Sequence, residues 1–259
     1  MPEYDVDQLL EEWRINGLVV FESLIPEETV DKIREAWVPL RQAGVREQGP
    51  EPVRGTGRYN VRVPFHRPFV DPDIFEHPSL VAFLEGALGE DYVWNHFDSN
   101  IPIETCRDYQ QWHRDTQIPF PGLMTPSYTV GVKFPLVDTD EQNGSIEVLP
   151  GTQFVSDTDL QSDLDRVFGK GDARRGHYSS IRLNLKKGSL WIHDARIFHR
   201  GTPNLSDVPR DELCMAMSRP WLFNKWQYEH TEPHFPRDLW ESLSDHAKQV
   251  LRRQRVKDR

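Results

Sequence analysis

One stretch decides the interpretation of this sequence: Tyr109-Gln110-Gln111-Trp112-His113-Arg114-Asp115-Thr116. His113 and Asp115 are two residues apart, and on an extended backbone such residues point to the same face. An imidazole and a carboxylate could then bind one metal ion together. On a helix each residue turns by about 100°, so the two side chains would point roughly 200° apart. The pair therefore predicts part of a metal site near the end of a strand, with a third ligand supplied from elsewhere in the chain.

Composition limits the classes of protein that can contain this pair. The chain has 259 residues and a net charge of −10, which argues against a nucleic-acid partner because phosphate backbones require a basic surface. No apolar run approaches the roughly 20 residues of a membrane span, and the acidic N-terminus lacks the features of a signal peptide. The two cysteines, Cys106 and Cys214, belong to no CxxC motif, so we expect a cytoplasmic protein without a disulfide framework.

The first 90 residues predict helices around a short strand. An apolar stripe that ends at Asn16-Gly17 predicts a helix over Asp5–Ile15, and Leu18–Phe21 is long enough for a strand. A second helix is expected to begin at Pro26, where two glutamates in the first turn favour the helix dipole. A third helix is expected over Pro78–Leu88.

Residues 41–60 are expected to form a loop, because they contain four glycines and two prolines and show little periodicity. The arginines at positions 54, 58, 62 and 67 lie in its second half or just after it. Two interpretations stay open for them. They form either a solvated basic surface, which is the usual place of arginine, or a clamp for an anionic co-substrate.

From about Asp91 the sequence changes to short apolar or alternating runs that turn residues separate. Eight of these runs are candidate strands: Tyr92–Phe97, Ile101–Cys106, Tyr128–Leu136, Ser145–Leu149, Ile181–Leu185, Leu190–His193, Arg196–Gly201 and Leu213–Met217. This number of short strands predicts an antiparallel jelly roll or barrel. Residues 152–178 are polar and are expected to be a long insertion that could act as a lid. The tail from Trp221 is expected to contain a charged helix around Leu239–Arg253.

The third metal ligand must come from the ten histidines, and the sequence favours His199. Most of the others lie outside the strand region, which leaves His193 and His199. His199 ends a run of strand character, and a tight turn follows it. Two neutral nitrogens and one carboxylate define the open facial site of non-heme iron oxygenases. Zinc and manganese accept the same ligands, so the residue types alone leave the metal open.

Arg210 is the predicted anion anchor. It precedes the run Leu213–Met217, and in a hairpin it would return close to His199. Its alternation places it on the same face as three small residues that could border a cavity. A guanidinium there would hold a carboxylate through two hydrogen bonds. Three aromatic residues could wall this cavity or simply belong to the core: Trp112, Trp191 and Phe198.

Taken in order, these motifs resemble the phytanoyl-CoA dioxygenase family of Fe(II)/2-oxoglutarate oxygenases. The resemblance spans roughly residues 5–220 and rests on His113-Arg-Asp115, on Asn143-Gly-Ser-Ile-Glu-Val-Leu-Pro-Gly-Thr-Gln153, and on His199-Arg-Gly-Thr-Pro-Asn204 with Arg210. The arginine stands eleven positions after the distal histidine. One departure is Gln153, where many members have histidine, but this turn is not part of the metal set.

The resemblance implies a fold and a ligand set. The fold would be mainly β with flanking helices, a double-stranded β-helix or cupin-like jelly roll with N-terminal helices. His113, Asp115 and His199 match the iron ligands of the family. Related halogenases replace the carboxylate with a small residue, so the presence of Asp115 disfavours halogenation.

The resemblance also implies the co-substrates, 2-oxoglutarate and O2, with succinate and CO2 as products. Arg210 matches the residue that binds the distal carboxylate of 2-oxoglutarate. Gln110 is similar to an amide that contacts 2-oxoglutarate in several members, and Thr116 is a further candidate for such a contact.

We therefore expect one domain over residues 1–259, with a helical part at 1–90, a jelly-roll core at 91–220 and a tail at 221–259. The expected function is oxidation, by default hydroxylation, of a C–H bond in a small metabolite or natural product, and the arginines at 54–67 would suit an anionic one. No nucleic-acid or membrane partner is expected. Two alternatives stay open: a zinc- or manganese-dependent cupin-like hydrolase or isomerase, and a non-catalytic jelly roll that binds a ligand.

Overall fold

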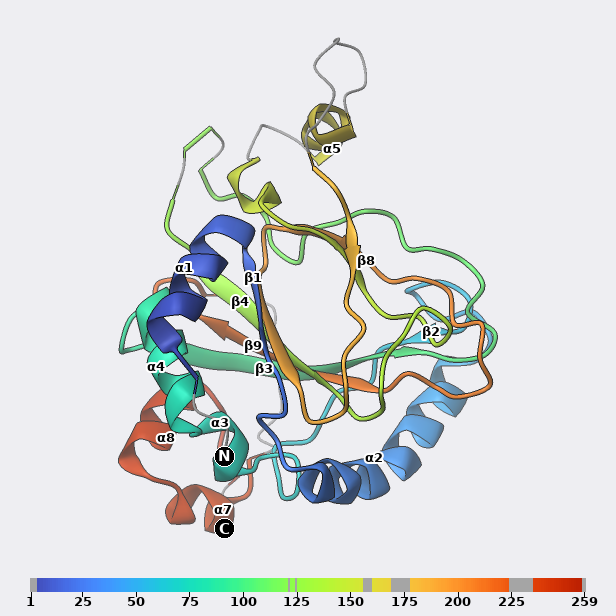
Figure 1. Ribbon diagram of the computed structural model, residues 1–259. Helices are drawn as coiled ribbons and strands as arrows, with labels where there is room; N and C mark the ends of the chain where they lie inside the picture. Colours follow the sequence, from blue (N-terminus) through green and yellow to red (C-terminus); the bar gives the residue numbers. More distant parts are fainter. Residues whose placement is uncertain are drawn as a thin grey trace.

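Two antiparallel sheets form the centre of the structure, a computed structural model that describes residues 4–120, 122–123, 125–155, 160–168, 178–223 and 235–257 (Figure 1). The major sheet has the order β1 (Leu18–Phe21), β7 (Leu190–Asp194), β4 (Thr129–Pro135), β9 (Glu212–Ser218), β3 (Val93–Pro102) and β2 (Arg58–Tyr59). The minor sheet has the order β6 (Ile181–Arg182), β5 (Glu147–Leu149) and β8 (Phe198–Arg200). This confirms the expected jelly roll with N-terminal helices.

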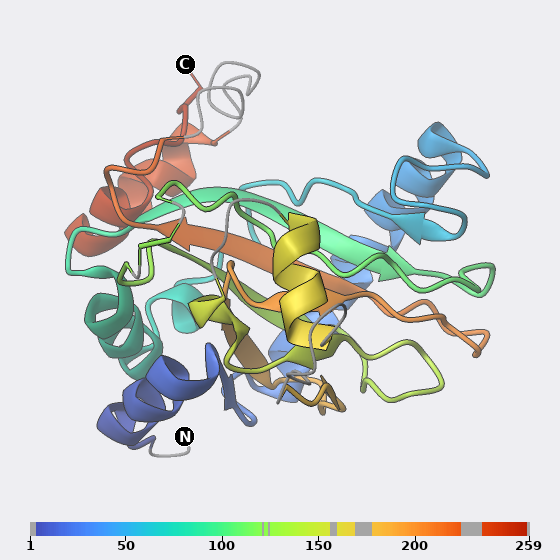
Figure 2. The same cartoon turned by 90° about the horizontal axis from the view of Figure 1, so that it is seen from above.

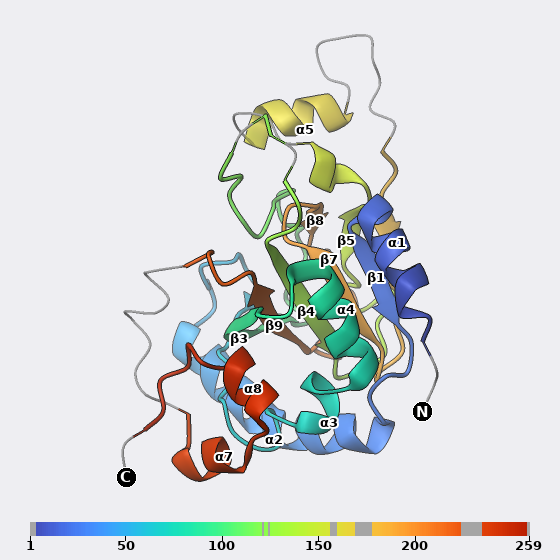
Figure 3. The same cartoon turned by 90° about the vertical axis from the view of Figure 1, so that its left-hand side faces the viewer.

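Helices cover the outer side of the major sheet. They are α1 (Val6–Asn16), α2 (Glu27–Gln48), α3 (Pro72–Phe75), α4 (Pro78–Leu88), α7 (Arg237–Ser242) and α8 (Asp245–Val250). Figure 3 shows α2, α3, α7 and α8 on the side of the major sheet that faces away from β5 and β8. On the opposite side, α5 (Leu160–Phe168) lies over the strands when the molecule is seen from above (Figure 2).

Strand alternation gives the major sheet two different faces. On β4, Val130, Val132 and Phe134 are buried in the large hydrophobic cluster that the helices complete. The residues between them, Gly131 and Lys133, face the other way, toward the minor sheet. The outer face therefore stabilises the fold, whereas the inner face carries polar side chains in a buried space. The large cluster includes residues from Leu10 to Leu251, and the single domain over residues 1–259 stays a prediction.

Two predicted helices have nearly the expected bounds. Asp5 caps α1 by accepting a hydrogen bond from the Gln8 backbone N–H, and Gly17 ends it at φ 69°, a conformation that favours glycine. The helix α4 begins at Pro78 and ends at Leu88, as its first-turn proline and following glycine predict.

The loop predicted over residues 41–60 is wrong for its first part, because α2 continues to Gln48. Gly44 is helical rather than a helix breaker. A Cβ at this position would lie 2.3 Å from Cγ2 of Val61, so the glycine allows the helix to pack closely against the following segment. Gly49, at φ 71°, follows the helix end.

Three other predictions require correction. The runs Tyr92–Phe97 and Ile101–Cys106 are not two strands, because β3 continues from Val93 to Pro102 and residues 103–106 are not strand. The register of β3 is irregular between Trp94 and His96. The predicted hairpin between His199 and Arg210 does not form, because β8 belongs to the minor sheet and β9 to the major sheet. The predicted C-terminal helix is two short helices, α7 and α8, and Ser244 is the N-cap of the second.

The predicted insertion over residues 152–178 contains a 3-10 turn, Thr152–Phe154, and α5. The rest of that segment lies partly outside the described residues, as do His177, His230 and His234. Among the helices that the structure describes, none is both long and apolar enough to cross a membrane.

Candidate metal centre

Backbone pairing brings the two distant parts of the site together. His113 and His199 form an isolated antiparallel bridge in which each N–H donates to the other carbonyl oxygen at 3.1 Å. Two residues further along, the Asp115 N–H donates to the Ala195 carbonyl at 2.9 Å. His113 is thus paired with β8, and Asp115 is fixed against the residues that precede β8, whereas the prediction placed the pair near the end of a strand.

The three predicted metal ligands converge. Each of His113, Asp115 and His199 offers one ligand atom, and these atoms lie within 4.8 Å of one another. Oδ1 of Asp115 lies 3.4 Å from Nε2 of His199 and 3.8 Å from Nε2 of His113. The two imidazole rings have a centroid separation of 4.4 Å. Among the described residues, this is the group of three or more such side chains that could hold a metal ion.

Hydrogen bonds prepare both histidines for metal binding. Nδ1 of His113 donates to the Gln111 carbonyl at 2.9 Å, and Nδ1 of His199 donates to the Ile197 carbonyl at 3.2 Å. Because a carbonyl oxygen only accepts, each Nδ1 carries the proton and each Nε2 is left with a free lone pair. Burial and the neighbouring His199 lower the pKa of His113 to about 4, which keeps this ring neutral at pH 7.

The carboxylate of Asp115 is held in its charged form. Burial alone would raise its pKa, but interactions with His199 and Lys133 outweigh this effect and hold the pKa well below the usual value. A charged oxygen and two neutral nitrogens on one side of a point are the donor set of an open facial metal site. The residues present therefore fit a divalent ion such as iron.

A cavity of about 270 Å³ opens directly beside these ligands. Gln110 lines it, and its Oε1 also accepts a hydrogen bond from the Gly201 N–H at 3.0 Å. Cys214 and Ala216 line it as well, which confirms that small residues on the alternating face of β9 border a cavity. Burial raises the pKa of the Cys214 thiol to about 12, so this thiol is protonated at pH 7.

Two further residues, Lys133 and His193, contact Asp115, and neither contact was predicted. Lys133 lines the cavity with 5% of its surface exposed, and its Nζ lies 3.6 Å from Oδ2 of Asp115. Although burial disfavours the charge, the Asp115 carboxylate raises the pKa of Lys133 above its usual value. His193 lies beneath the ligands, fully buried, with Nε2 at 3.0 Å from the same Oδ2.

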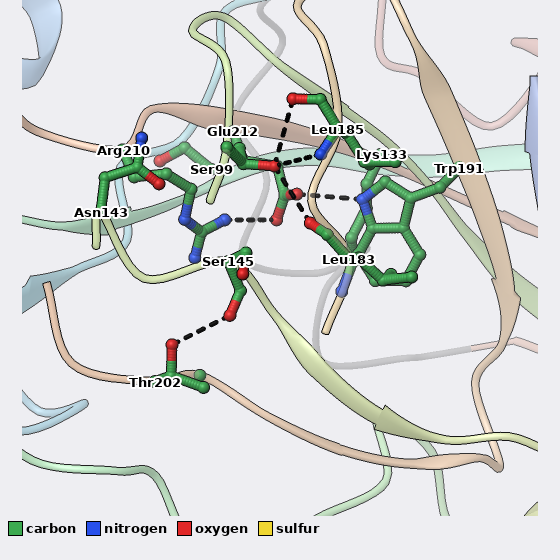
Figure 4. A network of polar contacts seen from close by, with 12 residues as sticks. Ser99, Lys133, Asn143, Ser145, Leu183, Leu185, Trp191, Thr202, Arg210 and Glu212 are labelled. Atoms are coloured by element: carbon green, nitrogen blue, oxygen red, sulfur yellow. Dashed lines mark hydrogen bonds and ion pairs between the residues drawn. The ribbon is translucent and has the colours of Figure 1, made fainter. Parts of the chain in front are cut away.

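Arg210 lies inside the barrel, beyond the lining of this cavity. It is fully buried, and its Nη1 lies 2.9 Å from Oε2 of Glu212. Figure 4 shows the Glu212 carboxylate between Arg210 and Trp191, whose Nε1 donates to Oε1 at 3.0 Å. Apart from this contact with Glu212, Nε and Nη2 of Arg210 have no hydrogen-bond partner among the described residues. Buried donors without acceptors are costly, so this position fits a carboxylate group of a bound ligand.

Arg58 is a second buried guanidinium near the same place. Only 2% of its surface is exposed, and Nη2 donates to the Thr202 carbonyl at 2.9 Å. Its Nη1 has no hydrogen-bond partner among the described residues. Burial and the nearby Arg210 lower the pKa of Arg58 to about 10, although the neighbouring Cys106 opposes this effect. The interpretation of the four arginines as a solvated surface is thus wrong for Arg58, whereas Arg62 and Arg67 are exposed.

The remaining predicted residues lie away from the cavity lining. Thr116 is half-buried and its hydroxyl contacts the Gln117 carbonyl at 3.4 Å, so its predicted role in cofactor binding receives no support from a described contact. Trp191 packs against His193 at 5.0 Å and beneath the Lys133 ammonium. Trp112 stacks under Arg200, and Phe198 stacks under Arg114. These three aromatic residues support the site rather than wall the cavity.

The sequence does contain an indication of the residues that were missed. Lys133 interrupts an apolar strand. Its neighbours Val132 and Phe134 are both buried, so a lysine between them indicates an inner polar face. His193 lies on the same face of β7 as Trp191, but no pattern in the sequence pairs it with Asp115. Only the register, which places His193 opposite Gly131, makes that contact predictable.

The comparisons with known proteins agree with this geometry. The sequence profile of the family described as phytanoyl-CoA dioxygenase (PhyH) matches residues 13–211. Among solved structures, the fold is similar to a non-heme alpha-ketoglutarate-dependent epimerase, SnoN, from nogalamycin biosynthesis, with 16% identity and a TM-score of 0.61 over 83% of this chain and 80% of that one. It is also similar to AviO1 from Streptomyces viridochromogenes Tue57, with 16% identity and a TM-score of 0.62 over 86% of this chain and 99% of that one.

Proposed function

We propose, from the premise that this chain belongs to the phytanoyl-CoA dioxygenase family, that it hydroxylates a C–H bond of a small polar molecule. The protein is an Fe(II)- and 2-oxoglutarate-dependent dioxygenase that uses O2. The observation that carries the proposal is the convergence of His113, Asp115 and His199 on one point beside a cavity. Family membership favours this reaction over the zinc- or manganese-dependent and non-catalytic alternatives, which the residue types alone left open.

In this proposal His113 and His199 bind the metal through Nε2, and Asp115 binds it through Oδ1. Bound iron would supply the redox chemistry with 2-oxoglutarate and O2 that the side chains lack. The protein would hold the three ligand atoms on one side of the ion, so that the other side of the ion would face the cavity. The backbone bridge between His113 and His199 keeps the two imidazoles in register.

The buried cations of the barrel support binding of a dicarboxylate. Three cationic side chains, Arg58, Lys133 and Arg210, are almost fully buried. Glu212 is paired with Arg210, and Asp115 lies 3.6 Å from the Lys133 ammonium. Once Asp115 binds a metal, Lys133 would lose much of its compensating charge. A dianionic keto acid would restore the balance, with its distal carboxylate on Arg210 and with Gln110 and Lys133 beside the chelating end.

Part of the cavity lining supports a polar substrate. The alternating β3 residues His96, Asp98 and Asn100 line the cavity, and so does Arg54. Nε2 of His96 lies 3.4 Å from Oδ2 of Asp98. These groups suit hydrogen bonding to a polar molecule, and Arg54 suits an anionic group on it. A related structure, SnoN in complex with Fe3+, alpha-ketoglutarate and nogalamycin RO, shares the fold with 18% identity and a TM-score of 0.57, and it supports a small-molecule substrate here.

Both cysteines are free thiols, which supports the expectation of a reducing compartment such as the cytoplasm.

A panel assay tests the proposed reaction. The purified protein, loaded with Fe(II) and supplied with 2-oxoglutarate, O2 and ascorbate, is incubated with matched sets of polar carboxylates, phosphates and neutral polyols. We expect release of succinate above the uncoupled background together with a product 16 Da heavier than one panel member. Arg54→Gln is expected to slow turnover of anionic members more than of neutral ones. Succinate release that no polar compound stimulates, while an apolar set does stimulate it, would contradict the proposed substrate class.

A further inference from the structure

The geometry points to His193 as a positioning residue that holds Asp115 so that only one of its two carboxylate oxygens faces the metal. This inference rests on the proposed function, because it assumes that His113, Asp115 and His199 bind a metal ion. It adds a fourth residue to the site, one that contacts a ligand rather than the ion.

The two oxygens of Asp115 have different surroundings. Oδ1 faces the two ligand imidazoles, with Nε2 of His199 at 3.4 Å and Nε2 of His113 at 3.8 Å. Oδ2 faces inward, with Nε2 of His193 at 3.0 Å and Nζ of Lys133 at 3.6 Å. Only Oδ1 is therefore available to an ion that also contacts both imidazoles. The contacts on Oδ2 occupy the oxygen that would otherwise allow the carboxylate to chelate through both atoms.

His193 is built into the sheet for this contact. Its side chain is fully buried, and its ring lies 5.0 Å from the Trp191 ring and 4.9 Å from the His199 ring. At 3.0 Å from a carboxylate oxygen, Nε2 must carry the proton and donate it in a hydrogen bond. This leaves Nδ1 without a proton and, among the described residues, without a hydrogen-bond partner. A buried polar atom without a partner is unfavourable, so the ring orientation is explained by the contact with Asp115 rather than by solvation of the ring.

The neighbouring strand leaves space for this ring. Gly131 on β4 is paired with His193 on β7 and with Ala216 on β9. A Cβ added at Gly131 would lie 2.4 Å from Cε1 of His193. Any side chain at position 131 would therefore push the imidazole away from its present place. The glycine and the histidine form one unit, because the first provides the room in which the second reaches Asp115.

Residues that hydrogen-bond to metal ligands orient those ligands, and their loss costs about 10- to 100-fold in metal affinity or activity. His193 differs from a ligand in one respect that can be measured. Its Nε2 is directed at Oδ2 of Asp115, and it is not a member of the cluster whose ligand atoms lie within 4.8 Å of one another. The metal should therefore show two coordinated histidines, not three.

Three variants test the inference through metal affinity, measured anaerobically by competition with a chelator for Fe(II) and for Co(II). His193→Phe keeps a ring of similar size and removes the donor, and we expect it to weaken metal binding by about 10- to 100-fold. His193→Gln places an amide N–H near the position of Nε2, and we expect most of the affinity to return. Gly131→Ala retains every polar group and displaces the ring, so its loss should approach that of His193→Phe.

Controls separate this inference from the proposed function and from misfolding. His66→Phe makes the same change at an exposed histidine and should leave affinity unchanged. Thermal unfolding of each apoprotein shows whether the variants fold. Wild-type protein that binds no metal would refute the proposed function itself. Wild-type protein that binds metal, with folded His193→Phe binding within twofold of it, would refute only the role of His193. Electron spin echo measurements that count three coordinated histidines in the wild type would make His193 a ligand and would also overturn the inference.

Discussion

Replacement of Arg210 separates two roles that the structure gives to this residue. Its guanidinium lies 2.9 Å from the carboxylate of Glu212, and both side chains are buried. Removal of one partner from a buried ion pair costs about 3–5 kcal/mol, because the other charge stays buried without compensation. In Arg210→Gln, Glu212 still accepts the hydrogen bond from Trp191 and lies near Lys133. We therefore expect the free energy of unfolding to fall by about 3 kcal/mol, the lower end of this range.

The same substitution should weaken 2-oxoglutarate binding by a separate mechanism. If the guanidinium forms two charge-assisted hydrogen bonds with the distal carboxylate, each contributes about 1.5–3 kcal/mol. Their loss should raise the Kd of 2-oxoglutarate by about 100-fold or more. The double variant Arg210→Gln/Glu212→Gln removes both charges. We expect it to recover stability to within about 1 kcal/mol of the wild type and to bind 2-oxoglutarate as poorly as the single variant.

Two assays distinguish these effects. Urea unfolding of the apoprotein gives the free energy of unfolding, and anaerobic titration of the Fe(II) protein with 2-oxoglutarate, followed by the visible charge-transfer band, gives the Kd. Glu212→Gln is the matched control, because it removes the competing carboxylate and should bind 2-oxoglutarate at least as tightly as the wild type. If the double variant is stable and binds 2-oxoglutarate with wild-type affinity, Arg210 is a structural residue and not the anchor.

Three further predictions follow from the described contacts. Burial and Lys133 lower the pKa of His193 to about 3. Below about pH 6.5 the unfolded chain therefore binds a proton at this histidine that the native apoprotein does not bind. Because of this difference, the free energy of unfolding should fall by about 2 kcal/mol as the pH is lowered from 7.5 to 5. Urea unfolding across this range should show a shallower dependence for His193→Gln, and parallel curves would contradict the assignment. Trp37→Phe removes the hydrogen bond of 3.0 Å to the buried Asp211 and should lower the free energy of unfolding by about 1–3 kcal/mol. A change below about 0.5 kcal/mol in the same assay would show that this contact is not stabilising. Saturation with Fe(II) at about 100 times its Kd should stabilise the protein by about 2.7 kcal/mol. This gain in thermal stability should disappear when a chelator is added or when His199 is replaced in His199→Ala. A gain that persists in His199→Ala would place the ion elsewhere.

The parts of the fold that local residue chemistry determines were predictable from the sequence. Pro78 and Gly89 mark the ends of α4, and Asp5 and Gly17 mark those of α1. The alternation of β9 also predicted that its small residues border a cavity.

The errors arose where packing with a distant segment decides the structure. Gly44 reads as a helix breaker, but in the folded protein it allows α2 to pack against Val61. The sequence also gave no indication that β8 and β9 belong to different sheets.

The site shows the same division. The pair His113 and Asp115 was predictable because two residues on one extended face are sufficient for the argument. His199 was predictable from its place at the end of a strand run. The contact of His193 with Asp115 depends on the pairing of β4 with β7 and on the absence of a side chain at Gly131, so only the three-dimensional arrangement reveals it.

The most direct test of the central claim is the position of a bound metal. Crystals grown anaerobically with Fe(II) and 2-oxoglutarate, with data collected at the iron absorption edge, would locate the ion by its anomalous scattering. The account predicts one iron roughly 2 Å from Nε2 of His113, Nε2 of His199 and Oδ1 of Asp115, with 2-oxoglutarate on the side of the cavity. Iron bound elsewhere, or bound with either histidine turned away from it, would contradict the account.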